Sequence, residues 1–88
     1  MKKKQRSKQV FIRTVTHYYT GRVVEETARE IVLDLAAWIA DTGRFSEAMR
    51  TGSVSKVEPY PDGVLVRVQR GAIVDICDWP HALLRVVK

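Results

Sequence analysis

Cysteine and histidine are scarce in this 88-residue sequence, which contains one cysteine, Cys77, and two histidines, His17 and His81. A single cysteine excludes a disulfide within the chain and any metal site built from several thiolates. Neither histidine has a carboxylate or a cysteine at ligand spacing, so we expect no metal and no cofactor. The acidic neighbours of Cys77 in "DICD" predict a buried strand cysteine with a raised pKa, which is a poor nucleophile.

Long apolar runs and catalytic motifs are also missing from the sequence. No apolar segment approaches the roughly 18 residues of a membrane span, and the basic start lacks the apolar region of a signal peptide. The segments "DTGR" and "RTGS" are typical of helix ends rather than of a glycine-rich phosphate loop, and no pair of carboxylates stands out. The sequence therefore predicts an intracellular protein that binds something and is not an enzyme.

The formal net charge of +5 is concentrated in the first eight residues, "MKKKQRSK". From residue 9 onward acidic and basic residues are equal in number, which predicts a basic flexible tail at 1–9 and one compact β-rich domain at 10–88. The tail could follow nucleic acid or be only a solvated segment. Its cations are Lys2, Lys3, Lys4, Arg6 and Lys8. Because so short a chain buries only about 60–65% of its unfolded surface, we expect a homo-oligomer.

Residues 10–25, "VFIRTVTHYYTGRVVE", are rich in the β-branched and aromatic side chains that favour strands. We expect one continuous strand with a bulge or bend at Gly21. Alternation along it would place on one face the side chains of Phe11, Arg13, Val15, His17 and Tyr19.

The second half of the chain predicts one short helix and three strands. The helix lies in "FSEAMRTG", with Ser46 as N-cap and Gly52 as its terminating residue. The strands follow in "SVSKVEP", "VLVRVQ" and "GAIVDIC", the first two joined as a hairpin by the turn "PYPDG". We expect the last residues to dock on the sheet through Trp79 and Leu83.

The segment between these regions, residues 27–40, fits two interpretations. Thr27 and Glu30 would form a capping box for a helix, and apolar residues follow at helical spacing. Against this, "EIVL" is β-branched and "EETAR" is polar enough to turn a hairpin. The periodicity favours a helix, and the residues alone leave the strand open.

Arginines and aromatic residues are the candidates for binding. Arg13, Arg22 and Arg44 could present bidentate donors to phosphates. A flat face for a base could come from Tyr18, Tyr19 and Trp38. The alternative is structural, because tyrosine and tryptophan also fill cores with their polar tips at the rim, and strand arginines usually face water.

The segments "FIRTVTHYYTGRVVE", "IVLDLAAWIADTGRFSEAMRTG", "VEPYPDG" and "GAIVDICDWPHAL" resemble a family of small proteins from tailed bacteriophages and prophages. The likeness covers residues 10 to about 83 and is carried by Arg13, Thr14, Gly21, Leu33, Ala36, Trp38 and Gly52. It implies that "EIVL" is a strand and that the helix comes later, near residues 45–51. We therefore expect an α+β, mostly β fold, a small bent antiparallel sheet or barrel of about five strands with one short helix.

The resemblance also implies a phage protein in the cytoplasm of a bacterial host. Some small phage proteins bind nucleotide immune signals, cyclic oligonucleotides or ADP-ribose derivatives, and sequester them without cleavage. On that hypothesis the three arginines would neutralise phosphates, the tyrosines or Trp38 would stack a base, and His17 would donate to a phosphate or ribose. The alternatives are a nucleic-acid-binding accessory protein and a protein-binding inhibitor or structural module.

Overall fold

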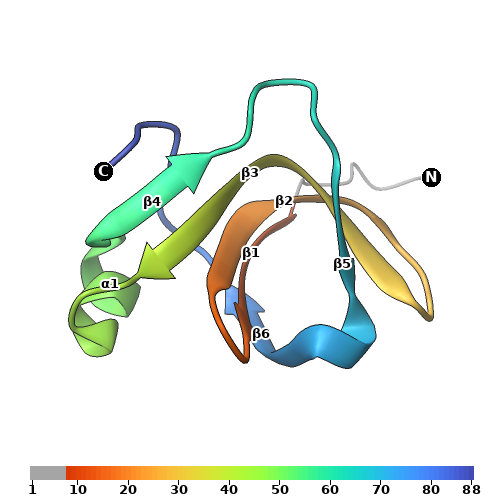
Figure 1. Ribbon diagram of the computed structural model, residues 1–88, viewed down its shortest axis with the longest axis horizontal. Helices are drawn as coiled ribbons and strands as arrows, with labels where there is room; N and C mark the ends of the chain where they lie inside the picture. The colour runs from red at the N-terminus through yellow and green to blue at the C-terminus, as the bar shows by residue number, and fades with distance from the viewer. Residues whose placement is uncertain (1–7) are drawn as a thin grey trace, which may run out of the picture.

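Six strands and one α-helix make up residues 8–88, the part of the chain that the computed structural model describes (Figure 1). Their bounds are β1 Lys8–Thr14, β2 Tyr18–Glu26, β3 Glu30–Asp41, α1 Phe45–Thr51, β4 Lys56–Pro59, β5 Val66–Gln69 and β6 Ile73–Asp78, with a 3₁₀ turn, η1, at Arg70–Ala72. The prediction of a mostly β domain with one short helix is confirmed, with six strands in place of about five. Among the described residues, no helix has the length and apolarity needed to cross a membrane.

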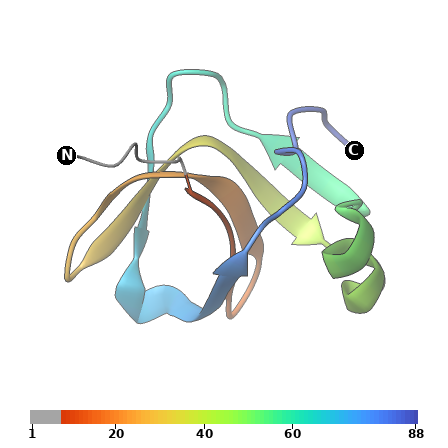
Figure 2. The ribbon, with the colours of Figure 1, turned by 180° about the vertical axis from the view of Figure 1, so that it is seen from behind.

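All six strands belong to one open antiparallel sheet, in the order β4-β3-β2-β1-β6, with β5 also paired to β3. The long strand β3 makes this possible, because β5 pairs with its residues 30–33 and β4 with its residues 37–41. Figures 1 and 2 show the sheet curling, so that β5 stands across the curl from β1 and β2, and the chain then returns to β6, which pairs with β1. The prediction that β4 and β5 form a hairpin is wrong, because each of them pairs with β3 and they do not pair with each other.

A bulge bends the sheet at the glycine where the sequence predicts one. The pairing of β2 with β3 shifts between Thr20 and Arg22, on either side of Gly21. The extra residue lies on β3, where Leu35 has a φ of 49°. A Cβ on Gly21 would lie 3.0 Å from the Cβ of Leu33, so glycine allows the two strands to approach closely here.

The single strand expected at residues 10–25 is instead a hairpin. The chain turns at residues 15–17, where the backbone N–H of Thr14 donates to the carbonyl of His17 at 2.9 Å. The Thr14 hydroxyl donates to the same carbonyl at 2.7 Å. In the resulting register Arg13 is opposite Tyr18, so these two residues share a face that Tyr19 does not.

The segment 27–40 is a turn followed by β3, so the helical interpretation is wrong and the one implied by the resemblance is confirmed. Thr27, the residue expected to cap a helix, closes the turn between β2 and β3. Its hydroxyl accepts hydrogen bonds from the backbone N–H groups of Arg29 at 3.1 Å and Glu30 at 3.0 Å. The same side-chain chemistry that caps helices also stabilises tight turns, which explains the ambiguity.

Two apolar clusters pack on opposite faces of the sheet. The first fills the curl of the sheet and comprises Val10, Ile12, Ile31, Leu33, Ala36, Val66 and Val68. The second lies beneath α1 and the C-terminal segment and comprises Phe11, Ala37, Ile39, Ala48, Val54, Val57 and Trp79. Leu83 packs against this second cluster, which confirms the expected docking of the last residues through Trp79 and Leu83.

The N-terminal boundary of the domain and the helix caps differ in detail from the predictions. Strand β1 begins at Lys8, so Lys8 and Gln9 belong to the sheet, and Lys8 lies 3.5 Å from Glu26. The other cations expected in the tail lie outside the described residues. The N-cap of α1 is Arg44 and not Ser46, while Gly52 ends the helix as predicted.

Replacing Gly52 with alanine is expected to lower the free energy of unfolding by roughly 2–4 kcal/mol. Gly52 has a φ of 81°, and a Cβ there would lie 2.6 Å from the Cβ and Cγ of His81. Gly63 is the matched control, because its φ is 88° and a Cβ would meet nothing within 4 Å. Its replacement should cost only about 1–2 kcal/mol. Urea unfolding measures both, and equal losses would show that the His81 contact does not restrain the helix end.

Candidate functional site

Aromatic side chains from neighbouring strands meet on one face of the sheet. Tyr19 on β2 is the register partner of Trp38 on β3, so both side chains point to the same side. The His17 ring lies 4.9 Å from the Tyr19 ring and 5.4 Å from the Trp38 ring, centroid to centroid. Tyr60 adjoins Tyr19 at the edge of the first apolar cluster. We call His17, Tyr19, Trp38 and Tyr60 the aromatic face.

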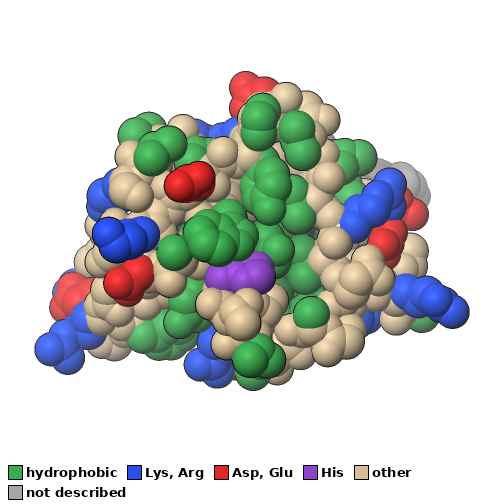
Figure 3. All heavy atoms as spheres, viewed as in Figure 1, with side chains coloured by type: hydrophobic (Ala, Val, Ile, Leu, Met, Phe, Trp, Pro, Cys, Tyr) green, Lys and Arg blue, Asp and Glu red, His purple; other side chains and the backbone are tan. Residues whose placement is uncertain are grey.

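The aromatic face lies beside two surface hollows. One of about 320 Å³ lies between the β1–β2 turn and β5, and its lining includes His17, Tyr19, Arg67 and Val68. The other, of about 340 Å³, lies beside Trp38 against Pro59, which ends β4, and Pro61, which follows it. Figure 3 shows hydrophobic side chains gathering around a histidine over β2 and β3 and continuing toward the β4–β5 connection. The site is therefore an open, largely apolar surface.

The two ring nitrogens of His17 have different surroundings among residues 8–88. Its Nδ1 lies 2.7 Å from the hydroxyl of Thr16. Its Nε2 is buried, without a hydrogen-bond partner among the described residues. A buried polar atom without a partner costs about 1–3 kcal/mol, and a ligand hydroxyl or carbonyl would recover this stability only if the side chains that cover Nε2 move aside.

Burial makes Tyr19 a poor acid, and the nearby hydroxyl of Tyr60 adds to the effect. Both raise the pKa of Tyr19, so its hydroxyl is held in the neutral form at physiological pH. A neutral phenol donates a hydrogen bond without adding negative charge to the face.

The other four predicted site residues lie away from the aromatic face. Tyr18 stacks on Phe11 in the second apolar cluster, with the ring centroids 5.4 Å apart. Arg13 forms two hydrogen bonds to Asp75, at 3.2 and 2.5 Å, and its guanidinium lies 5.7 Å from the ring centroid of Phe45. The predicted set of seven residues is therefore divided between the two faces of the sheet.

Arg22 and Arg44 complete this second group. Arg22 forms a bidentate pair with Asp34, at 2.8 and 2.6 Å, and these hydrogen bonds lower the pKa of Asp34. Arg44 is exposed at the start of α1 and forms no ion pair within residues 8–88. Two of the three arginines expected to meet phosphates thus already have carboxylate partners.

Sequence reasoning missed three residues around the aromatic face. Tyr60 is hidden in "PYPDG", which signals a turn, although two prolines around a tyrosine also restrict its backbone. Glu58 is the register partner of Trp38 and places a carboxylate beside the indole. Arg67 is exposed on β5. Its guanidinium lies 2.7 Å from the carboxylate of Glu30, whose pKa is lowered by Gln69 and then by Arg67.

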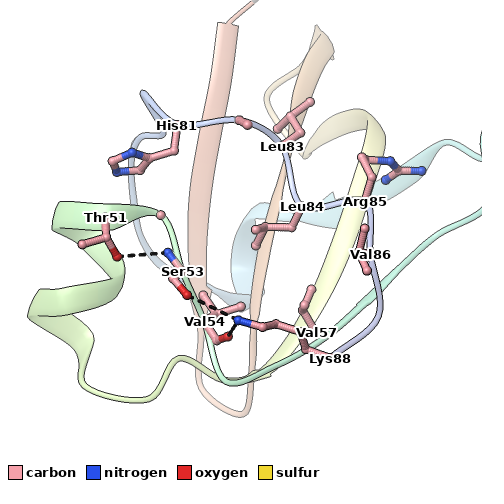
Figure 4. A pocket seen from close by; sticks show the side chains of 12 residues that line it. Thr51, Ser53, Val54, Val57, His81, Leu83, Leu84, Arg85, Val86 and Lys88 are labelled. Atoms are coloured by element: carbon pink, nitrogen blue, oxygen red, sulfur yellow. Dashed lines mark hydrogen bonds between the residues drawn. The ribbon is translucent and has the colours of Figure 1, made fainter.

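A third hollow, of about 360 Å³, lies between the end of α1, β4 and the C-terminal segment (Figure 4). Its polar groups are occupied by backbone partners. The ammonium group of Lys88 donates to Val54 O at 2.9 Å, Arg85 donates to Ala36 O at 2.9 Å, and His81 Nε2 lies 2.7 Å from Met49 O. These contacts hold the C-terminal segment against α1, the α1–β4 connection and β3, so the polar groups of this hollow have structural roles.

Metal binding has no support in the described part of the chain, where no three His, Cys, Asp or Glu side chains gather. Cys77 is exposed and not buried as expected, although desolvation and then Asp75 and Asp78 raise its pKa as the sequence predicts. No protein-family model matches this chain, and no curated protein or solved structure is significantly similar to it. Function must therefore be inferred from the aromatic face itself.

Proposed function

We propose that the protein is a non-enzymatic binding protein that holds the flat base of a nucleotide on the aromatic face. The supporting observation is the contrast between its two tryptophans. Trp79 is 2% exposed and fills a core, whereas Trp38 is half-buried, beside His17, and lines the second hollow. A base stacked on such a ring contributes about 1–3 kcal/mol to binding.

The charges around the aromatic face limit the ligand that it fits. Glu58 lies beside Trp38. Arg67 lies at the rim of the first hollow and donates a hydrogen bond to the carboxylate of Glu30. This arrangement suits a ligand with one or two negative charges and its phosphate near Arg67. The proposal retains His17, Tyr19 and Trp38 from the sequence prediction. It assigns no ligand contact to Arg13, Tyr18, Arg22 and Arg44.

The resemblance to small tailed-phage proteins provides the biological setting of this proposal. In that setting the ligand is a cyclic oligonucleotide or ADP-ribose-type immune signal in the cytoplasm of a bacterial host. Binding alone would protect the phage, because a sequestered signal cannot reach its receptor. No group transfer or hydrolysis is required.

Thermal unfolding with a panel of nucleotides tests the proposal. The panel contains cyclic dinucleotides, cyclic trinucleotides and ADP-ribose, with ribose 5-phosphate as the control that lacks a base. A ligand present at 100 times its Kd adds about 2.7 kcal/mol, which corresponds to a rise in Tm of roughly 10–20 °C for a domain of this size. Ribose 5-phosphate should produce no rise. Unchanged melting curves across the panel would contradict the proposal.

A protein-binding module is the second candidate, favoured by exposed apolar residues, one of which lines the first hollow. Val15 in the β1–β2 turn is 86% exposed, and Leu65 before β5 is 50% exposed. This function would be favoured if the protein captures one host protein and does not respond to nucleotides. Replacing Val15 or Leu65 with aspartate should then abolish the capture.

Nucleic-acid binding predicts a different result. The affinity for single-stranded DNA would fall steeply as the salt concentration rises, and deleting residues 1–7 would reduce this salt dependence.

A further inference from the structure

Strand β6 forms one edge of the sheet, and its outer side pairs with no strand among residues 8–88. Five of its six residues are exposed, including Val74 at 56% and Ile76 at 38%. Natural proteins usually protect such an edge with lysine, proline or a covering segment. The sequence of β6, "IVDICD", contains neither lysine nor proline.

The opposite edge of the sheet is protected. The backbone of Val57 in β4 exchanges two hydrogen bonds with Lys88, at 3.2 and 2.9 Å, so the C-terminal residue covers this edge. Pro59 ends β4 and removes a further donor. The β4 edge is therefore covered, whereas the β6 edge, like the outer side of β5, pairs with no strand among residues 8–88.

The backbone groups of β6 that face outward can be identified from its pairing with β1. Trp79 N–H donates to Gln9 O at 2.9 Å, so the backbone of Trp79 points toward β1. The register continues with Cys77 opposite Phe11 and Asp75 opposite Arg13. Because backbone direction alternates along a strand, Ile76 and Asp78 present their N–H and C=O groups to the free side.

We propose that β6 is the pairing edge for a second copy of this chain, in an antiparallel dimer with its twofold axis at Ile76. The proposal does not depend on the ligand of the aromatic face. A twofold axis makes each strand its own partner, so the surface must be self-complementary. Pairing would extend the sheet across both copies and satisfy the outward backbone groups of β6.

The side chains of β6 favour an axis at Ile76 over axes at Cys77 and Asp78. An axis at Asp78 would place two carboxylates opposite each other, and an axis at Cys77 would place Ile76 opposite Asp78 of the second copy. An axis at Ile76 pairs the two isoleucines and places no two acids in opposition. Ile76 is also the register partner of the fully buried Ile12, so its burial would extend the first apolar cluster.

A cysteine at position 76 tests both the partner and the register. In the variant Ile76→Cys with Cys77→Ser, the two new thiols would lie on residues with Cα atoms about 5.5 Å apart, a distance that suits a disulfide. Mild oxidation of the full chain should therefore give a covalent dimer. The control Val74→Cys with Cys77→Ser places its thiols four strand positions apart, about 13 Å, and should stay uncrosslinked.

Sedimentation of the wild-type chain across a concentration series gives an independent result. A monomer–dimer equilibrium is expected, and Ile76→Lys should abolish the dimer while leaving the circular dichroism spectrum unchanged. Three results would overturn the proposal: a wild-type monomer at all concentrations, an assembly larger than a dimer, or crosslinking at position 76 no faster than at position 74. A disulfide between wild-type Cys77 residues would overturn the register at Ile76.

Discussion

Replacing Trp79 with alanine should lower the free energy of unfolding by about 3–5 kcal/mol. The indole is 2% exposed and stacks on Phe11, with the ring centroids 5.6 Å apart and the planes at 20°. The His81 ring meets its edge at 4.9 Å, and Nε1 donates to Ala82 O at 3.1 Å. One side chain thus joins the sheet to the segment that follows β6.

The loss is large relative to the total stability of a small domain, which is about 5–15 kcal/mol. Urea unfolding followed by circular dichroism measures it. Trp79→Phe is the matched variant, because it keeps a ring against Phe11 and loses the hydrogen bond to Ala82, at a cost of about 1–2 kcal/mol. A loss below 1 kcal/mol for Trp79→Ala would show that the C-terminal segment is not part of the cooperative core.

Replacing Trp38 with alanine is expected to weaken nucleotide binding by about 5- to 150-fold, the equivalent of 1–3 kcal/mol of lost stacking. The effect should be specific to the aromatic face. Trp38→Phe keeps a flat ring and should retain part of the affinity. Titration calorimetry with the nucleotide that raises Tm most measures all variants.

Arg13→Ala and Arg44→Ala are the controls for this series. Arg13 lies on the opposite face, where Asp75 and Phe45 occupy its guanidinium, and Arg44 lies at the start of α1. Both variants should bind within about twofold of the wild type, which corresponds to a difference of roughly 0.4 kcal/mol. Loss of binding in Arg13→Ala with normal binding in Trp38→Ala would place the ligand on the other face.

The parts of the fold that depend on local chemistry could be predicted from the sequence. Gly52 ends α1 because a left-handed residue is required there, and Gly21 marks the bulge because the strands approach closely. The pairing of β4 and β5 could not be predicted, because "PYPDG" has the composition of a hairpin turn. The length of β3 explains this pairing, because a strand of twelve residues can pair with both β4 and β5, one after the other, along the same edge.

The hairpin at residues 15–17 explains why the candidate site was only partly predicted. Its turn contains Val15, Thr16 and His17, with no glycine, proline or asparagine to signal it, and it is closed by the Thr14 hydroxyl. If a turn is not recognised in the sequence, every later residue of the strand is predicted to lie on the wrong face of the sheet. Tyr19 therefore lies beside Trp38 on one face of the sheet, a pairing that the sequence pattern does not predict. Arg13 lies on the opposite face.

The two indole N–H signals in the NMR spectrum test the proposed site most directly. Trp38 and Trp79 are the only tryptophans in the chain, and a Trp38→Phe spectrum assigns them. As ADP-ribose or a cyclic dinucleotide is added, the Trp38 signal should shift progressively while the Trp79 signal stays in place. A Trp38 signal that does not move while the ligand binds, or a shift confined to Trp79, would contradict nucleotide binding on the aromatic face.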